Sequence, residues 1–514
     1  MNYDEWSEGY FSRSPYVHGY NRLINPQMLR MICVFAGVEY PSGEGANYLE
    51  LGFGQGLSIN IHASANEGSY WGVDFNAIHA SGAKRMAAAS EANIHIFNES
   101  FRDFSARSDL PEFDFIVLHG VWSWISDENR AFIVDIINRR LRVGGIVYVS
   151  YNCFPGWAPI IPVRELMTLY MRKSGRASES DAVVSDAISF AREVLKSQST
   201  YLAGNPVAAH HLDTLGDDYK YIAHEYLNSE WEITTLERVA NQLARAQLNF
   251  VASTRMLENI DAFCVDEAGK RLLDEIRDPV TRVSVMDYMM NARFRCDVFA
   301  KGALPVFPAE HRENWKGMRF TLVVPKGEIP SKIKVPRGEV DFFDSPLSAV
   351  SEALFGDEYA PKTIDEILDF EKGRSVSFDE IVDALIVMMD SGYVSPAKIS
   401  SNIIIDKCKK FNRYALRRAS FSTEIDHLAS PVTGGGVMIP HIYQLFLGAL
   451  VEGKFEIYDL VGSVQDAMSN VQGGFILGEN NYNSSGRDDF SWVHDFADDF
   501  LKNKLPLFKA LLII

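Results

Sequence analysis

The feature that most restricts the fold is an alternation of short apolar runs with helical stretches between residues 46 and 151. The apolar runs have the length of buried strands, and the segments between them have the spacing of helices. The expected strands span residues 47–51, 69–75, 93–97, 113–120 and 146–151, and the expected helices span residues 57–65, 78–92 and 127–141. Strands that alternate with helices form parallel sheets through right-handed crossovers. We therefore predict a doubly wound α/β sheet, with its ligand outside the carboxyl ends of the strands.

A glycine-rich turn, Gly52 to Gly56, follows the first expected strand. A dinucleotide site needs G-x-G-x-x-G, and Leu57 stands where the third glycine would pack a helix under a pyrophosphate. A P-loop needs a lysine directly after its last glycine, and Leu57 occupies that place as well. The turn therefore suits neither a diphosphate nor a triphosphate, although the glycines could also serve only to turn a corner.

Acidic residues at the strand ends indicate a ligand without phosphate. Glu50 precedes the glycines, and Asp74 ends the second expected strand, where a carboxylate can accept both hydroxyls of a ribose. This combination fits S-adenosylmethionine (SAM), which carries an ammonium, a sulfonium and an adenosine. The predicted cofactor-binding residues are Glu50, Gly52, Phe53, Gly54, Gly56, Asp74, Phe75, Ser100, Phe101 and His119.

The third strand end would place Ser100 and Phe101 against the adenine. Asp103 is an alternative contact for the adenine amino group, or it only caps the following segment.

Aromatic residues in the strand-end loops are candidates for the acceptor side of the site. Aromatic faces can orient a cationic amine through cation–π contacts of roughly 0.5–2 kcal/mol each, although core packing would explain the same residues. His119 is either a general base or a structural histidine, and Tyr16 lies in an N-terminal segment that could cover the cofactor. The candidate catalytic residues are Tyr16, His119, Trp122, Trp124, Tyr151 and Trp157.

Two motifs, HGVWSW at residues 119–124 and VSYNCFPGW at residues 149–157, resemble a specific family. It is that of the bacterial class I methyltransferases with a methyltransferase regulatory domain, whose relatives include rickettsial protein lysine methyltransferases. Further patches of resemblance lie at residues 224–228, 291–299 and 428–437. The sequence has Phe53 where a cysteine is frequent in the family.

The resemblance implies three regions. A Rossmann-like SAM-binding domain with an N-terminal lid would span residues 1–165, and a largely helical middle domain would span residues 166–335. A winged-helix-like α+β region would occupy residues 336–514. The resemblance also suggests a homodimer.

The composition excludes some partners. Fifty basic residues against 68 acidic ones, a net charge of −18, argue against a protein that binds nucleic acid or membrane surfaces. The five cysteines lie far apart and predict free thiols, and the histidines lack metal-ligand spacing, so no metal is expected. We see no signal peptide and no apolar run of the ~20 residues that span a bilayer, which predicts a soluble, cytoplasmic protein.

These observations predict a SAM-dependent methyltransferase. A protein lysine is the first candidate acceptor, and a small molecule or a natural-product intermediate is the second. A protein that binds SAM or its product S-adenosylhomocysteine (SAH) without catalysis, and that recruits a partner, is the alternative from another class.

Overall fold

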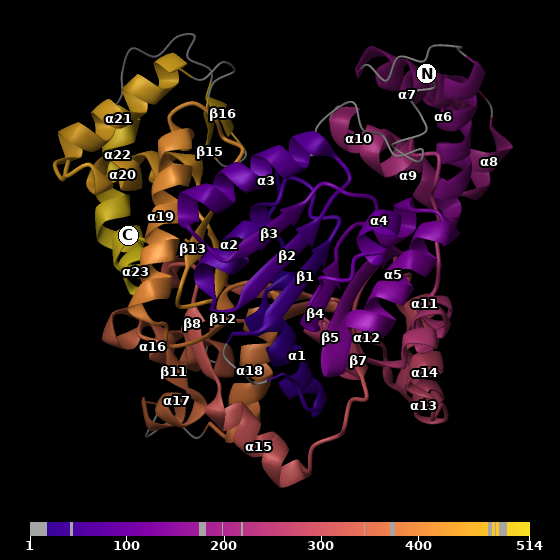
Figure 1. Cartoon of the computed structure of the whole chain (residues 1–514), viewed down its shortest axis with the longest axis horizontal. Coiled ribbons are helices and arrows are strands. Elements are labelled where there is room, and N and C mark those ends of the chain that lie inside the picture. The colour runs from indigo at the N-terminus through magenta and orange to yellow at the C-terminus, as the bar shows by residue number, and fades with distance from the viewer. Residues whose placement is uncertain are drawn as a thin grey trace.

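The computed structural model describes residues 18–41, 45–173, 181–197, 199–216, 219–343, 345–370, 376–470, 475–477, 480–482 and 491–514. A seven-stranded sheet forms the centre of this part of the chain, in the order β3-β2-β1-β4-β5-β7-β6 (Figure 1). Its strands are β1 (Asn47–Leu51), β2 (Ser69–Val73), β3 (Ile94–Phe97), β4 (Phe113–Leu118), β5 (Leu141–Asn152), β6 (Leu248–Ser253) and β7 (Phe294–Lys301). Neighbours among β1 to β5 pair in parallel, which confirms the doubly wound sheet.

The last two strands lie beyond residue 165, where we expected the SAM-binding domain to end. β7 runs antiparallel to β5 and to β6, so residues 248–301 complete the same sheet. Six consecutive residues of β7 are buried, because both faces of this strand are covered. Such a strand has no period-two alternation, and periodicity therefore could not distinguish it from the helical sequence around it.

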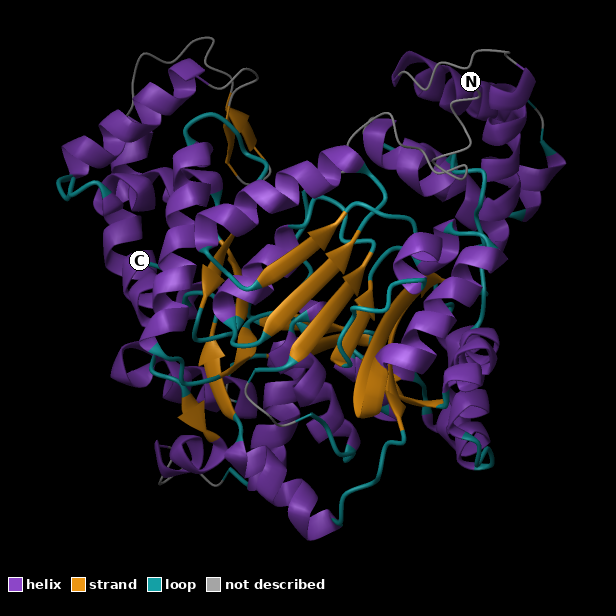
Figure 2. Cartoon of the chain, viewed as in Figure 1, coloured by secondary structure: helices purple, strands orange, loops and turns teal. Residues whose placement is uncertain are grey.

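Helices cover both faces of the sheet, as Figure 2 shows. One face carries the apolar side chains of Tyr48, Tyr70 and Tyr148 and packs against α1 (Pro26–Ala36), α2 (Leu57–Ala65) and α3 (Ala77–Ser90). The other face packs against α4 (Phe101–Ser105), α5 (Asp127–Arg140), α11 (Leu236–Leu243) and α14 (Pro279–Met290). The short helices α12 (Asp261–Cys264) and α13 (Glu267–Asp274) lie between β6 and α14.

A helical insertion separates β5 from α11 and lies beside the carboxyl ends of the strands (Figure 1). It contains α6 (Ile161–Lys173), α7 (Asp181–Lys196), α8 (Thr200–Gly204), α9 (Pro206–Thr214) and α10 (Tyr219–Tyr226), which share an apolar core of their own. The chain leaves and returns at one place. The N–H of Phe154 donates to the carbonyl of Thr234 (3.0 Å), and the N–H of Thr234 donates to the carbonyl of Asn152 (3.1 Å).

The C-terminal region begins with α15 (Pro308–Gly317) and contains a three-stranded antiparallel sheet in the order β11-β8-β12. Its further elements are β8 (Arg319–Leu322), β9 (Lys332–Val335), β10 (Gly338–Asp341), α16 (Pro346–Tyr359), β11 (Lys362–Thr363), α17 (Ile364–Phe370), α18 (Phe378–Asp390), β12 (Val394–Ala397), α19 (Asn402–Ala419), β13 (His427–Ser430), β14 (Gly435–Met438), α20 (His441–Val451), α21 (Ile457–Asn470), β15 (Phe475–Leu477), β16 (Asn480–Tyr482), α22 (Ser491–Asp499) and α23 (Leu505–Ala510). The winged-helix-like character of this region stays a prediction.

The β13–β14 hairpin joins the C-terminal region to the N-terminal part of the chain. The Nδ2 of Asn66, directly after α2, donates to the carbonyl of Gly434 (2.6 Å). A Cβ at Gly436 would lie 3.0 Å from the ring of Tyr20, so this glycine permits the close approach. Helix α19 also packs against α2 and α3.

The five cysteines are buried and free, as the sequence predicts. Among the described residues, no helix has the length and apolar character to cross a bilayer.

Candidate functional site

A cavity of about 960 Å³ lies at the carboxyl ends of β1, β2, β4 and β5. This is the edge of the sheet where the sequence places the ligand. Side chains from the strand ends line one part of the cavity, and residues within 211–216 and 222–226 of the helical insertion line another. The volume is near the upper end of the ~300–1,000 Å³ typical of ligand pockets.

The glycine turn adopts a backbone that side chains would obstruct. Gly52, Gly54 and Gly56 have φ values of 72°, 56° and 74°, in the left-handed region. A Cβ at Gly52 would lie 2.6 Å from Cγ2 of Val121, and one at Gly56 would lie 2.6 Å from Cβ of Ala83. A Cβ at Gly54 would meet no atom within 4 Å, and Gly54 lines the cavity. The turn therefore presents its backbone to a ligand.

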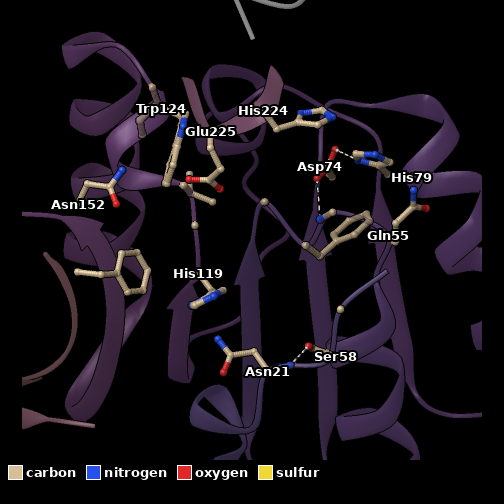
Figure 3. A pocket seen from close by; sticks show the side chains of 18 of the residues that line it. Asn21, Gln55, Ser58, Asp74, His79, His119, Trp124, Asn152, His224 and Glu225 are labelled. Carbon is tan, nitrogen blue, oxygen red and sulfur yellow. Dashed lines mark hydrogen bonds and ion pairs between the residues drawn. The ribbon is translucent and has the colours of Figure 1, made fainter. Parts of the chain in front are cut away.

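Asp74 is held against this turn. Its Oδ2 accepts a hydrogen bond from the N–H of Gly54 (2.9 Å), and its Oδ1 accepts one from the N–H of Asn76 (2.8 Å). His79 Nδ1 lies 3.4 Å from Oδ1 (Figure 3). A carboxylate has about four acceptor sites, so both oxygens keep capacity for the hydroxyls of a ribose. The structure thus brings the glycine turn and the strand-end acid together.

Glu50 is buried at the end of β1 and also lines the cavity. Burial and, to a lesser extent, the negative charge of Asp74 raise its pKa to about 8, against a hydrogen bond from Tyr48 that lowers it. Within the described part of the chain, no cation compensates this carboxyl. A ligand ammonium would restore its charged form, and the site therefore fits the amino group of SAM.

The other predicted cofactor residues, Phe53, Phe75, Ser100 and Phe101, line the cavity. The Oγ of Ser100 caps α4 by accepting the N–H of Asp103 (3.1 Å), and it donates to Oδ2 of the same residue (2.8 Å). Asp103 is outside the cavity lining. The geometry therefore favours the capping role for Asp103.

His119 follows β4 and lines the cavity. Its side chain is open to the cavity but enclosed by protein, and burial, followed by the charge of Arg255, lowers its pKa to about 4. Nδ1 lies 2.9 Å from the hydroxyl of Tyr148 and 3.1 Å from that of Ser150. An imidazole with so low a pKa is a weak proton acceptor, and both hydrogen bonds hold Nδ1, so the geometry favours the structural interpretation over the general base.

The four aromatic candidates separate into two pairs. Trp124 and Trp157 line the cavity, as expected. Trp122 and Tyr151 are in the apolar core beneath it, so the expectation that they face the acceptor is corrected. The hydroxyl of Tyr151 donates to Oδ2 of Asp297 (2.5 Å) within a buried ion-pair network. Core packing explains both residues.

Tyr16 lies outside the described residues. The nearby Tyr20 and Asn21 line the cavity, and the N–H of Asn21 donates to Oγ of Ser58 (2.9 Å). An N-terminal segment therefore does reach the cofactor side of the cavity.

Several lining residues escaped the sequence analysis. Asn152 adjoins a predicted residue, and His224 and Glu225 belong to a patch of family resemblance to which we had assigned no role. Arg293 also lines the cavity, and its guanidinium carbon lies 4.4 Å from the ring centroid of Trp157. Only the fold brings residues within 211–216 and 222–226 to the strand ends, so periodicity and motif spacing could not have indicated their role.

A doubly wound sheet, a glycine turn bonded to a strand-end aspartate and a buried acid for an ammonium define a class I SAM-dependent methyltransferase. A methyltransferase domain family matches residues 49–145, and the family described as a predicted methyltransferase regulatory domain matches residues 218–301. The chain belongs to the class I methyltransferases that carry this regulatory domain, and its cofactor is SAM. The regulatory domain supplies β6, β7 and part of the cavity wall.

One relative covers nearly the whole chain, and another covers about two thirds of it. The uncharacterized protein sll1526 from Synechocystis sp. is 34% identical over 513 residues, which are 98% of this chain and 99% of that protein, and it belongs to the same family. The uncharacterized protein RP789 from Rickettsia prowazekii is 26% identical over 337 residues, 64% of this chain and 58% of that protein.

A solved structure shares the fold over most of its length. PKMT2 from Rickettsia typhi in complex with AdoHcy has a TM-score of 0.69 at 21% identity, covering 97% of this chain and 99% of that one. A second structure of PKMT2 from Rickettsia typhi has a TM-score of 0.67 at 20% identity, with the same coverage of both chains.

Proposed function

We propose that the protein transfers the methyl group of SAM to an amine of a protein, with lysine as the first candidate. The cavity carries this proposal, because it continues beyond the strand ends that would hold the cofactor into a part lined by Trp124, Trp157 and the helical insertion. That part offers an acceptor a pocket with aromatic walls. The name PKMT2 of the solved structure agrees with this acceptor class.

The residues of the chain would divide the work between two tasks. Asp74 would hold the ribose and Glu50 the ammonium, while the glycine turn lets the backbone approach the cofactor. When bound, SAM supplies an electrophilic methyl group. The cavity would then act mainly by positioning the acceptor, since an in-line displacement needs the reacting atoms close together and aligned.

A cytoplasmic location, the homodimer and the three-region division are part of the proposal and rest on the sequence. A small-molecule acceptor remains the second candidate, and a protein that only binds SAM or SAH remains the alternative from another class.

Labelled SAM and lysate fractions separated by size test this function. We expect the label in the protein fraction and none with Asp74→Ala, which should weaken SAH binding by at least ~10-fold because it removes a charged hydrogen-bond acceptor. Trp124→Ala should keep SAH binding and lose methyl transfer. Label in the small-molecule fraction would support the second candidate, and SAH binding without transfer to any fraction would support the non-catalytic alternative.

A further inference from the structure

Four acidic residues line the cavity: Glu50, Asp74, Glu99 and Glu225. The first two belong to the cofactor side described above. Glu99 pairs with Arg107 at 2.8 Å. Among the described residues, Glu225 has neither a hydrogen bond nor an ion pair, although its side chain is largely buried. Within this described part of the chain, Glu225 is therefore the cavity acid without a partner.

Glu225 lies on the acceptor side. It comes from α10 of the helical insertion, whereas the three other acids lie at or just after the carboxyl ends of strands. In Figure 3 it is on the side of Trp124 and Asn152, across the cavity from Asp74, with His119 below Glu225. A ligand that occupies both sides would meet Asp74 with one part and Glu225 with another.

None of the charged groups that face Glu225 in the described part of the chain forms an ion pair with it, so its carboxylate can bind a ligand cation. Arg293, at the start of β7, lowers the pKa of Glu225, but it is engaged over the ring of Trp157 and lies beyond ion-pair distance. His211 on α9 has its pKa lowered to about 4 by burial, so it is neutral at pH 7. His224 adjoins Glu225 in α10 and lines the same cavity.

We propose that Glu225 binds a primary ammonium group of the acceptor and takes its proton. This inference rests on the proposed methyl transfer to an amine and names the residue that recognises it. One N–H bond of the ammonium breaks, an O–H bond forms on the Glu225 carboxylate, and the electron pair stays on nitrogen. The nitrogen is then a neutral nucleophile.

An amine acceptor needs a group that removes its proton before the methyl transfer. A lysine amine has a reference pKa of ~10.4, so only a small fraction is neutral at pH 7. Burial raises the pKa of Glu225 to about 7, which suits a group that accepts and releases protons near neutral pH. The ring of Trp124, which lines the same cavity, adds an aromatic surface that favours a cation.

Binding to the SAH-saturated protein tests the recognition step without catalysis. The probe is N-acetyl-lysine methylamide, with N-acetyl-norleucine methylamide as the comparison that lacks the amine. We expect the wild type to prefer the lysine probe and Glu225→Gln to weaken its binding by ~10–100-fold, with SAH affinity unchanged. Glu230→Gln, the same change at an exposed position on the following loop, should leave both affinities unchanged.

The pH profile of transfer to poly-L-lysine tests the proton step. In the wild type, kcat/KM should rise with pH through a pKa of about 7, because Glu225 must be deprotonated to accept the proton. Glu225→Gln should lose this limb and ~100-fold in rate at pH 7, and recover toward the pKa of the amine. Glu225→Asp should keep part of the limb, which a merely structural role would not explain.

The outcomes separate the two proposals. Equal lysine-probe binding and equal pH profiles in wild type and Glu225→Gln overturn the role of Glu225 while methyl transfer to amines stands. SAH binding with transfer only to acceptors without an amine overturns both the role of Glu225 and the amine acceptor, but leaves the methyltransferase intact. Failure of the wild type to bind SAH overturns the cofactor site itself.

Discussion

Replacing Gly56 by alanine should destabilise the protein more than the same change at Gly54. Both glycines have left-handed φ values, for which a Cβ costs roughly 1–2 kcal/mol. Only at Gly56 would the new methyl also lie 2.6 Å from Cβ of Ala83 and 3.4 Å from the ring of Phe53. Overpacking of this kind costs ~1–3 kcal/mol. We therefore expect Gly56→Ala to lower the free energy of unfolding by about 2–5 kcal/mol and Gly54→Ala by about 1–2 kcal/mol.

A double-mutant cycle isolates the contact. Ala83→Gly alone should cost ~0.5–1 kcal/mol, because it places a glycine inside α3. In the Gly56→Ala background it removes the obstructing methyl, so the two changes together should be less harmful than their sum by ~1–3 kcal/mol. Equilibrium urea unfolding, followed by tryptophan fluorescence, measures all four proteins. Equal losses at Gly56 and Gly54, or strict additivity with Ala83→Gly, would refute the close packing of the turn against α3.

Two further predictions concern groups next to the site. Tyr151→Phe should lower the free energy of unfolding by about 1–3 kcal/mol, because Asp297 loses a buried hydrogen-bond donor. The SAH affinity measured by calorimetry should be unchanged. A loss of SAH binding without a loss of stability would contradict a core role for Tyr151. Burial lowers the pKa of His62 to about 3 in the folded protein. Between pH ~6.5 and 3 this residue therefore binds more protons in the unfolded chain than in the folded one, and the free energy of unfolding falls as the pH falls. The contribution of this residue is up to ~1.4 kcal/mol per pH unit. Urea unfolding from pH 7 to 4 should give a shallower slope for His62→Gln, and identical slopes would refute this assignment.

Local patterns were sufficient for the cofactor side of the site. The residues that indicated this side are the first two strands, the glycine turn and the acids at the two strand ends, all within thirty residues of sequence. The structure joins Gly54 to Asp74 by a hydrogen bond. Exclusion of phosphate ligands followed from Leu57 alone. Sequence patterns are informative here because each of them involves residues that a single βαβ unit places together.

The acceptor side could not be predicted in this way. Trp122 and Trp124 are two positions apart in one 3-10 turn, and only the tertiary packing decides that the first is in the core and the second lines the cavity. Glu225 is about 150 residues from Asp74 along the chain, and the fold of the insertion alone brings it to the same cavity. Burial on both faces likewise concealed β7 among helical sequence.

The paired hydrogen bonds between Phe154, Thr234 and Asn152 have an evolutionary consequence. Because the helical insertion leaves and re-enters the sheet at a single point, its length and sequence can change without moving any strand, and longer loops cost little additional closure entropy. The part of the cavity wall on the acceptor side can therefore evolve independently of the part on the cofactor side. Descendants of one ancestral enzyme could acquire new acceptors by altering residues 155–233 while retaining the same source of methyl groups.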